Sequence, residues 1–477
     1  MIQIDSSLTP ASLAPAIENL FAVSAPKIRA LQTRWADKSG TPVFTVAGEY
    51  TARGWTEWTQ GFQYGSAILQ FEATRDEEFL AIGRQGTLEK MASHLTHIGV
   101  HDHGFNNVST YGNLLRLQAL GIIPAHEWEK NFYELALKTT GAIQAARWTP
   151  LPQDLGYIYS FNGPHSLFSD TVRSLRALAV SHLLGHRLMH EGDKPASLLE
   201  RLLQHAETTA RYNVYYGTGR DFYDQPNTRG RTVHESIFNL NDGNYRCPST
   251  QQGYSPFSTW TRGLSWILTG YAEELEWLDV LDESGLEPFG GKNKWLDRFL
   301  EPAIATADFF IEHTPTDGIP YWDTGAPQLH RLGNYLDRPA EPDNAWEPVD
   351  SSAAAIAAQG YLRLGKFLLI EGIKTVATFI FRPDSPLPGL FLQSLISPSI
   401  PATKGSCSIA SIINPTVGIT CRQAKRLPKA NPANGATIIC GNSPSLFAAL
   451  PPVPSIIVSS TVLPVIDSFL NTTHSLL

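Results

Sequence analysis

About ten segments of helical length divide the first 367 residues of this chain. In each segment apolar residues recur every three or four positions, as Leu13, Ile17 and Leu20 do, and Ser7 or Thr9 can cap the first segment. Loops rich in Gly, Pro, Asn and Asp join the segments, and strand-like alternation is scarce. The pattern predicts an all-α array of antiparallel helical hairpins. The segments are 11–35, 61–72, 77–94, 111–120, 125–145, 169–188, 196–212, 257–281, 294–313 and 351–369.

The composition changes abruptly near residue 368. All 11 Trp and all 16 Tyr lie at or before Tyr361, whereas three of the four Cys follow it. Residues 368–477 are rich in Ser, Ile, Leu and Pro and show no helical period. We therefore expect an incomplete helical domain over 1–367 and an atypical tail over 368–477.

Two explanations fit the tail: a genuine disordered, low-complexity extension, or translation out of frame. With free choice of synonymous codons, residues 412–439 can encode, in a shifted frame, a string with Trp, Tyr, Gly-Asp and mixed charges. That string has the character of the first 367 residues. We favour the out-of-frame explanation, which predicts that a native last hairpin is missing.

Charge and hydropathy argue against several classes of protein. The formal net charge is −8 without a basic stripe, so nucleic-acid binding is not expected. Residues 1–367 contain no run of 18 apolar residues and no recognisable secretory signal, and Cys247 is their single cysteine. We expect a cytoplasmic protein that does not bind membranes. The sequence does not define its oligomeric state.

Two aspartates, Asp102 and Asp170, lie in polar clusters between the predicted helices. Loops at one end of a helical barrel would gather such clusters around a pocket. Acid–base chemistry on sugars needs a carboxyl group that is protonated near neutral pH, and a second acid or a dry pocket raises a pKa. Each residue has a structural alternative, since Asp170 can cap a helix beginning at Thr171 and Asp102 can form a turn.

Seven segments and single residues of unusual polar and aromatic character follow one another along the chain. They are WTQGF at 58–62, DHGF at 102–105, Asp170, His234, QGYSPFSTWTRG at 252–263, YWDTGAP at 321–327 and DSSAAAIAA at 350–358. Read in order, they resemble the unsaturated glucuronyl hydrolases, glycoside hydrolase family 88, and more loosely their unsaturated rhamnogalacturonyl relatives. The resemblance covers roughly residues 50–365 and implies an (α/α)6 barrel of six helical hairpins with a pocket at one end. The tail then stands in place of the last hairpin.

The resemblance implies a glycoside hydrolase that removes an unsaturated (4,5-ene) glucuronyl residue from the non-reducing end of an oligosaccharide. By this resemblance Asp170 protonates C4 of the C4=C5 enol ether and assists addition of water at C5. Asp102 holds the ring hydroxyls or tunes the proton of Asp170. Because C5 rather than C1 is hydrated, the separation of the two carboxyl groups does not predict a retaining or inverting outcome.

Five further residues are expected to contact the substrate, an oligosaccharide with a terminal uronic acid. His234 and Gln252 orient water or substrate, and Trp58 and Trp260 offer faces for ring stacking. Arg262 pairs with the uronate, because a guanidinium group matches a carboxylate bidentately. The structural alternatives are hydrogen-bonded polar residues, buried tryptophans and an internal ion pair for Arg262.

A metal and a cofactor are both expected to be absent. His94, His97, His101 and His103 lie close to Asp102, but their spacing matches no closed zinc site. The GTGR and DGNYR segments lack a phosphate-binding or dinucleotide fingerprint.

Two departures from the family pattern leave the substrate open. Pro256 and Phe257 replace two acids that the family typically has, and segment 211–231 is an unusual insert. One alternative is therefore a glycosidase of the same barrel that acts on saturated glucuronides or related uronides. Another is an inactive truncated homologue, because a missing hairpin leaves apolar helix faces unburied at about 25 cal/mol per Å².

Overall fold

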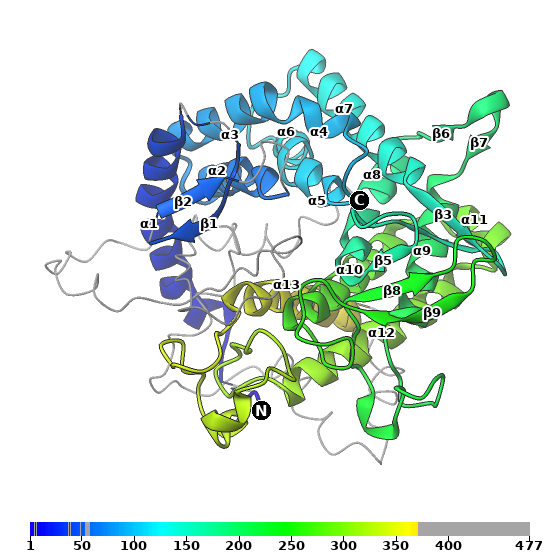
Figure 1. Ribbon diagram of the computed structural model, residues 1–477. Coiled ribbons are helices and arrows are strands. Elements are labelled where there is room, and N and C mark those ends of the chain that lie inside the picture. The colour runs from blue at the N-terminus through cyan, green and yellow to red at the C-terminus, as the bar shows by residue number, and fades with distance from the viewer. Residues whose placement is uncertain are drawn as a thin grey trace, which may run out of the picture.

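The computed structural model describes residues 1–370 except 4, 6, 37, 39, 48 and 53–57. Almost all of the predicted tail, from residue 371 onward, lies outside the described residues, so the prediction that a native last hairpin is missing stays a prediction. Helices dominate the described part and are arranged around a central axis (Figure 1). The all-α prediction is confirmed.

The longer helices follow the predicted segments closely. The main differences are two interruptions: α3 ends at Lys90 before the separate α4, and residues 169–174 form a 3-10 turn before α8. The helices are α1 (Pro10–Trp35), α2 (Gln60–Thr74), α3 (Glu77–Lys90), α4 (Ala92–Thr96), α5 (His103–Asn107), α6 (Asn113–Ala119), α7 (Glu127–Ala146), α8 (Leu175–Leu183), α9 (Leu198–Tyr212), α10 (Thr261–Val280), α11 (Glu283–Leu286), α12 (Lys292–Glu312) and α13 (Ser351–Ile370). A π-helical turn, Val108–Gly112, connects α5 to α6.

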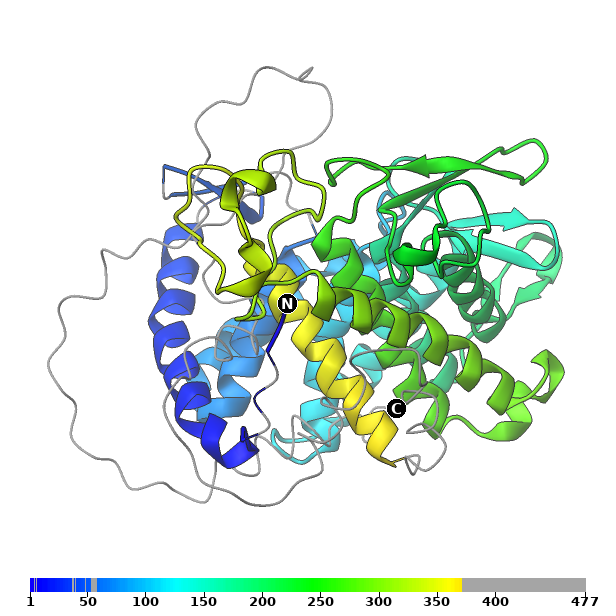
Figure 2. The ribbon, with the colours of Figure 1, turned by 90° about the horizontal axis from the view of Figure 1, so that it is seen from below.

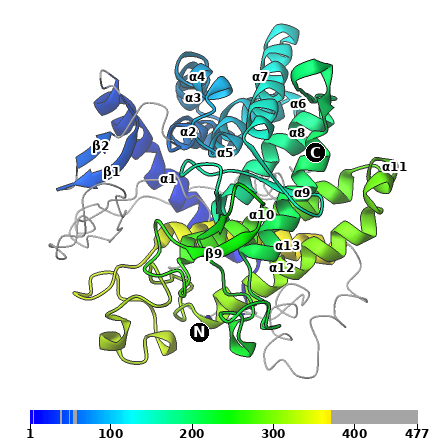
Figure 3. The ribbon, with the colours of Figure 1, turned by 45° about the vertical axis from the view of Figure 1, so that its right-hand side comes forward.

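Neighbouring helices pack together in pairs, most of them close to each other in the chain. α2 packs on α1 and α3, α7 packs on α8, and α10 packs on both α12 and α13. Figures 1 and 3 both show α10, α12 and α13 side by side. Two apolar clusters fill the layers between the helices, one centred on α8, α9 and α10 and the other on α2, α3 and α6. This pairing is the arrangement that the hairpin pattern predicted.

Nine short strands, which periodicity did not predict, occur in the described part. They are two to five residues long, so alternation along them is too brief to stand out in the sequence. Three antiparallel pairs join β1 to β2, β3 to β4 and β6 to β7, and one sheet has the order β5-β8-β9. The strands are β1 (Pro42–Val46), β2 (Glu49–Ala52), β3 (Trp148–Leu151), β4 (Leu155–Ile158), β5 (Ser166–Phe168), β6 (Leu188–Met189), β7 (Pro195–Ala196), β8 (Glu235–Phe238) and β9 (Tyr245–Ser249).

Most of the strands and the longest loops gather at one end of the helices (Figure 2). There the sheet β5-β8-β9 and the loop that carries residues 313–350 cover the helix ends. The expectation that interhelical loops collect at one end of the barrel is therefore met. Among the described helices, none combines the length and the apolar character that crossing a membrane requires.

Candidate active site

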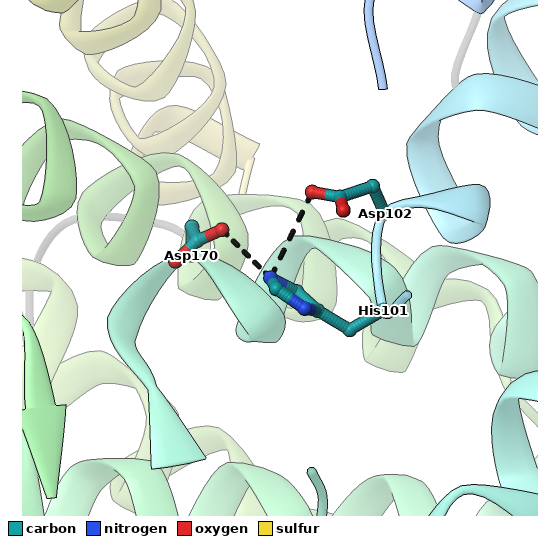
Figure 4. Close-up of side chains that lie close together, drawn as sticks. All are labelled: His101, Asp102 and Asp170. Carbon is teal, nitrogen blue, oxygen red and sulfur yellow. Dashed lines mark hydrogen bonds and ion pairs between the residues drawn. The ribbon is translucent and has the colours of Figure 1, made fainter. Parts of the chain in front are cut away.

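Two carboxyl groups meet one imidazole ring among the loops. The Nε2 atom of His101 lies 2.9 Å from Oδ2 of Asp170 and 3.7 Å from Oδ1 of Asp102. All three side chains are buried. Figure 4 shows both carboxyl groups turned toward the His101 ring. The two predicted acids, which come from distant parts of the chain, therefore share one small buried site.

Local structure brings the two acids together. Asp102 immediately precedes α5, and Asp170 lies in the 3-10 turn that follows strand β5. α5 packs directly on that turn, and the Ser174 hydroxyl donates a hydrogen bond to the backbone carbonyl of His101. The close contact requires Gly104, because a Cβ atom there would lie 2.4 Å from the Ser174 Cα.

Asp170 does not have the capping role that was its structural alternative, whereas Asp102 does lie in a turn, as its alternative expected. Residue 170 is not the N-cap of its turn, because Phe168 occupies that position. Asp102 does stand at the N-cap of α5, but its side chain makes no capping hydrogen bond. Two buried carboxyl groups without capping roles are expensive to maintain, and such groups are typical of functional sites.

Burial and mutual charge give the two acids opposite pKa shifts. Burial raises the pKa of Asp102, and the neighbouring Asp170 adds to this against the attraction of His101. Burial also acts to raise the pKa of Asp170, but the charge and hydrogen bond of His101 outweigh it, so that pKa is lowered. Asp102 therefore keeps its proton to a higher pH than Asp170 does.

The pKa values of two histidines in the site are shifted in opposite directions. Burial acts to lower the pKa of His101, but the carboxylates of Asp102 and Asp170 outweigh it, so the pKa is raised. Burial lowers the pKa of His234 to about 4. His101 thus keeps its proton to a higher pH than an ordinary imidazole does, whereas His234 is neutral near pH 7.

His234 lies beside Asp170 because strand β5 pairs with β8. The backbone N–H of Ser169 donates to the carbonyl of His234 over 2.8 Å. Nδ1 of His234 accepts from the backbone N–H of Gln251 over 2.9 Å, so the proton of the neutral ring is on Nε2. That Nε2–H is buried and has no hydrogen-bond partner in the described protein.

Further buried polar atoms at this site also have no partner within the described residues. Because native proteins leave few such atoms unsatisfied, their concentration here indicates the place of a polar ligand. They are Nδ1 of His101, Oδ1 of Asp170, Oγ of Ser169 and Oγ1 of Thr171.

The structure places Gln252 and Trp260 next to His234. The backbone N–H of Gln252 lies 3.4 Å from Nδ1 of His234, and the Gln252 side chain is half-buried. The ring of Trp260 packs edge-on against His234 at 4.9 Å and is only 5% exposed. Little of the Trp260 ring is thus accessible to a sugar, and its stacking role stays a prediction.

Trp58 and Arg262 are linked to the site less directly. Trp58 is half-buried and packs on Phe62, which stacks on Phe105 of α5. Arg262 forms a buried ion pair with Asp350, with 2.9 Å between Nη2 and Oδ2. The structural alternative for Arg262 is therefore realised, and its contact with a uronate stays a prediction.

The four neighbouring histidines divide into two groups. His103 lies between His94 and His97, with ring nitrogens 3.1 Å and 2.8 Å away, and His94 also contacts Gln60. His94 and His103 each use one ring nitrogen for one partner and the other nitrogen for the next partner. The three rings and Gln60 therefore form a hydrogen-bonded chain. Of the four histidines, His101 alone faces Asp102 and Asp170.

A cation is a second possible occupant of the acid cluster. The ligand atoms of His101, Asp102 and Asp170 lie within 4.8 Å of one another, which is compatible with one bound ion. The hydrogen bond between His101 and Asp170 accounts for their short contact without a metal. The expectation of no metal stays a prediction, which an assay with and without a chelator tests.

The sequence did not single out His101 and Phe161 as site residues. Phe161 follows strand β4, is 56% exposed, and lies 6.4 Å from the His101 ring in a stacked arrangement. A signal for His101 was present, because it directly precedes Asp102. Phe161 carried none, since an exposed aromatic residue in a loop has no periodic pattern.

Replacing Gly104 with Ala should separate the two acids. The added Cβ would press on the Ser174 backbone, and overpacking of this kind costs about 1–3 kcal/mol. We expect a lower denaturation midpoint and, in an activity assay, a lower kcat/KM. Gly285→Ala is the matched control, because nothing lies within 4 Å of its new Cβ. Equal stability and activity of the two variants would contradict this view of the α5 contact.

Comparison with known proteins gives a consistent picture. No family model matches the chain. It is 27% identical over 349 residues to an unsaturated glucuronyl hydrolase of Bacillus sp. strain GL1, which covers 70% of this chain and 76% of that protein. It is 22% identical over 324 residues to an unsaturated glucuronyl hydrolase of Formosa agariphila, covering 65% of this chain and 63% of that one. The match thus spans less than two thirds of the Formosa protein.

The fold also matches solved structures. An unsaturated glucuronyl hydrolase from Streptococcus agalactiae aligns with a TM-score of 0.56 at 16% identity, covering 93% of this chain and 90% of that one. The fold is therefore the helical barrel of those structures, and it carries a pair of buried acids. Within that class, the chain is a homologue of proteins named unsaturated glucuronyl hydrolase.

Proposed function

We propose that this chain is a glycoside hydrolase that removes an unsaturated (4,5-ene) glucuronyl residue from the non-reducing end of oligosaccharides by hydrating the C4=C5 bond. The observation that carries the proposal is the convergence of Asp102 and Asp170 on His101. Both acids stand in motifs that resemble this family, and the names of the curated relatives support the same activity.

In the proposed reaction, Asp170 delivers a proton to C4. Water adds at C5 and gives up one proton, and the resulting hemiketal collapses with release of the saccharide. Nε2 of His101 donates a hydrogen bond to Oδ2 of Asp170, so this pair holds the proton before the reaction. A uronate bound nearby adds negative charge and excludes water, and both effects raise the pKa of Asp170 toward the value that a proton donor needs. The proton that the attacking water gives up returns to the pair of Asp170 and His101.

The remaining residues would bind and orient the sugar. Asp102 would contact the ring hydroxyls and tune the proton of Asp170. The unpartnered Nε2–H of His234 would donate to water or substrate, with Gln252 beside it. The partner is thus an oligosaccharide with a terminal uronic acid. A cytoplasmic location remains part of the proposal, and cell fractionation tests it.

The proposal is tested with disaccharides that a polysaccharide lyase generates. Turnover removes the ultraviolet absorbance of the C4=C5 bond, and we expect this loss with the full-length protein. Release of an aryl group from a saturated β-glucuronide without such a loss would instead support the glycosidase alternative, which the altered residues 256–257 and the insert 211–231 keep open. Soluble aggregates with helical circular dichroism but no sharp melting would identify an inactive homologue.

The pH dependence of kcat/KM should report the proton on His101. The pKa of His101 is raised above 6.5, so the protonated pair is complete below that raised pKa and is lost as pH rises through it. We expect kcat/KM to fall on the alkaline side above pH 6.5. His101→Asn should lower kcat/KM by about 10²-fold and remove this limb. The exposed His330→Asn is the control, and an unchanged alkaline limb in His101→Asn would refute the assignment.

A further inference from the structure

Four aromatic side chains are exposed on two segments of the chain, 222–223 and 254–257. Phe222 is 84% exposed, Phe257 54%, Tyr254 51% and Tyr223 38%. The rings of Tyr223 and Phe257 lie 4.6 Å apart, and Phe222 packs edge-on against Tyr223 at 5.7 Å. We call these four residues the aromatic rim. A group of exposed aromatic rings is costly in water and typically marks a binding surface.

A short stretch of chain, residues 252–257, links the aromatic rim to the candidate active site. Residues 251 and 252 donate backbone hydrogen bonds to His234, which stands beside Asp170. Two residues later, the backbone N–H of Tyr254 donates to Asp323 over 2.8 Å, which fixes the direction of the segment. Phe257 follows Gln252 by five residues, so its backbone lies at most about 18 Å from that of Gln252. A short oligosaccharide can span this distance.

Hydrogen bonds to one buried carboxylate hold the loop that carries Phe222 and Tyr223. The buried carboxylate of Asp224 accepts hydrogen bonds from the backbone N–H groups of Gly217, Thr218 and Arg220 over 2.7–3.1 Å. These bonds hold the pKa of Asp224 below its usual range, against the effect of burial. The hydrogen bonds therefore hold the backbone on both sides of Phe222 and Tyr223, which reduces the backbone entropy lost on binding.

Charge around the aromatic rim favours a neutral ligand. Segment 211–231 contains four arginines, and each of them has a partner within the protein. Arg220 pairs with Asp221, Arg229 pairs with Asp308, and Arg231 donates to the carbonyl of Tyr223. The fourth, Arg211, donates to the Gln153 amide. Recognition of a sulfate group depends on guanidinium or ammonium groups that can reach it, and each of these four guanidinium groups already makes a contact within the protein. Two of their nitrogens that have no partner among the described residues, Nε of Arg220 and Nη1 of Arg231, are buried.

We propose that the aromatic rim is a subsite for the saccharide that the reaction releases, and that it takes a neutral, unsulfated sugar by stacking on its apolar face. The inference rests on the proposed function, because it assigns the rim to the leaving part of that substrate. It also accounts for Phe257 standing where the family pattern has an acid. The rim thus sets the specificity for the part of the substrate beyond the uronyl residue.

The test compares two substrates in the full-length protein: the methyl glycoside of the unsaturated uronate, and an unsulfated tetrasaccharide with the same terminal residue and three neutral sugars. In the double variant Phe222→Ala/Phe257→Ala we expect kcat/KM for the tetrasaccharide to fall about 10-fold, since one to two stacked rings contribute on this scale. The value for the methyl glycoside should not change. Trp128→Ala is the matched control, because Trp128 is an exposed, stacked aromatic residue on α7. It lies about 24 Å along that helix from Gln144, which contacts the Val100 carbonyl beside the site.

The outcomes separate this inference from the proposed function. Calorimetry of the saturated neutral trisaccharide product should show binding to the wild type and about 10-fold weaker binding to the double variant, whether or not turnover occurs. Turnover of both substrates with no effect of the double variant would overturn the subsite while leaving the proposed function in place. Tighter binding of a sulfated trisaccharide than of the neutral one would overturn the assignment to a neutral sugar. Product binding that depends on the rim, in a protein without turnover, would refute the proposed function alone.

Discussion

Replacing Asp170 with Asn is expected to lower kcat/KM for an unsaturated disaccharide by about 10²–10⁴-fold. The amide keeps the size of the side chain but cannot hold or deliver the proton that C4 receives. It also removes the charge that helps keep the pKa of His101 above its usual value. The measurement is the initial rate of absorbance loss at the C4=C5 bond, at several substrate concentrations and at pH 6.

Asp308→Asn is the matched control for this substitution. Asp308 lies on the outer helix α12 and pairs with Arg229 at 3.1 Å, where both side chains are about half exposed. Exposed pairs of this kind contribute at most about 1 kcal/mol, so activity should stay near the wild-type value. Full activity in the Asp170→Asn variant would exclude this residue as the proton donor.

Replacing Glu273 with Leu is expected to lower the free energy of unfolding by about 3–5 kcal/mol. Nε and Nη2 of Arg173 donate to the two carboxylate oxygens of Glu273 over 2.6 and 2.9 Å, and both side chains are almost fully buried. Arg176 lies 3.4 Å from the same carboxylate. Removing Glu273 therefore leaves a buried guanidinium group without its counter-charge. Denaturant titration followed by circular dichroism measures the loss.

The Glu273→Leu substitution should also disturb the active site, because Arg173 belongs to the same 3-10 turn as Asp170. Lys130→Ala is the control for a charge removed from the surface. Its pair with Glu134 is exposed and separated by one helical turn, so we expect a change below about 1 kcal/mol. A Glu273→Leu variant as stable as Lys130→Ala would show that this buried pair does not hold α10 to the turn.

Regular apolar spacing was sufficient to predict the long helices and their hairpin pairing. It did not reveal the 3-10 turn at 169–174, because Val172 and Leu175 keep a three-residue spacing that both kinds of helix share. The apolar spacing also continues past Met91 and so predicted one helix over 77–94. In the structure α3 ends at Lys90, and His94 turns inward to contact Gln60. Such interruptions depend on tertiary contacts that periodicity does not contain.

The order of the motifs was sufficient to bring Asp102, Asp170 and His234 to one place, as the structure does. It could not select His101 from the other histidines between residues 94 and 103. The fold makes that choice, since the Ser174 hydroxyl and the packing of α5 turn this one ring toward the acids. The sequence offered an internal ion pair as one alternative for Arg262 but could not identify Asp350 as the partner, because the two residues lie 88 positions apart in the chain.

Turnover of an unsaturated disaccharide in D2O, followed by NMR of the released uronate, tests the chemistry of this site most directly. Protonation at C4 followed by attack of water at C5 places one deuterium on the carbon that was C4 and a carbonyl group at the former C5. A product that retains its double bond, with no deuterium at C4 and a new hydroxyl at C1, would mean that the enzyme cleaves the glycosidic bond by ordinary anomeric attack.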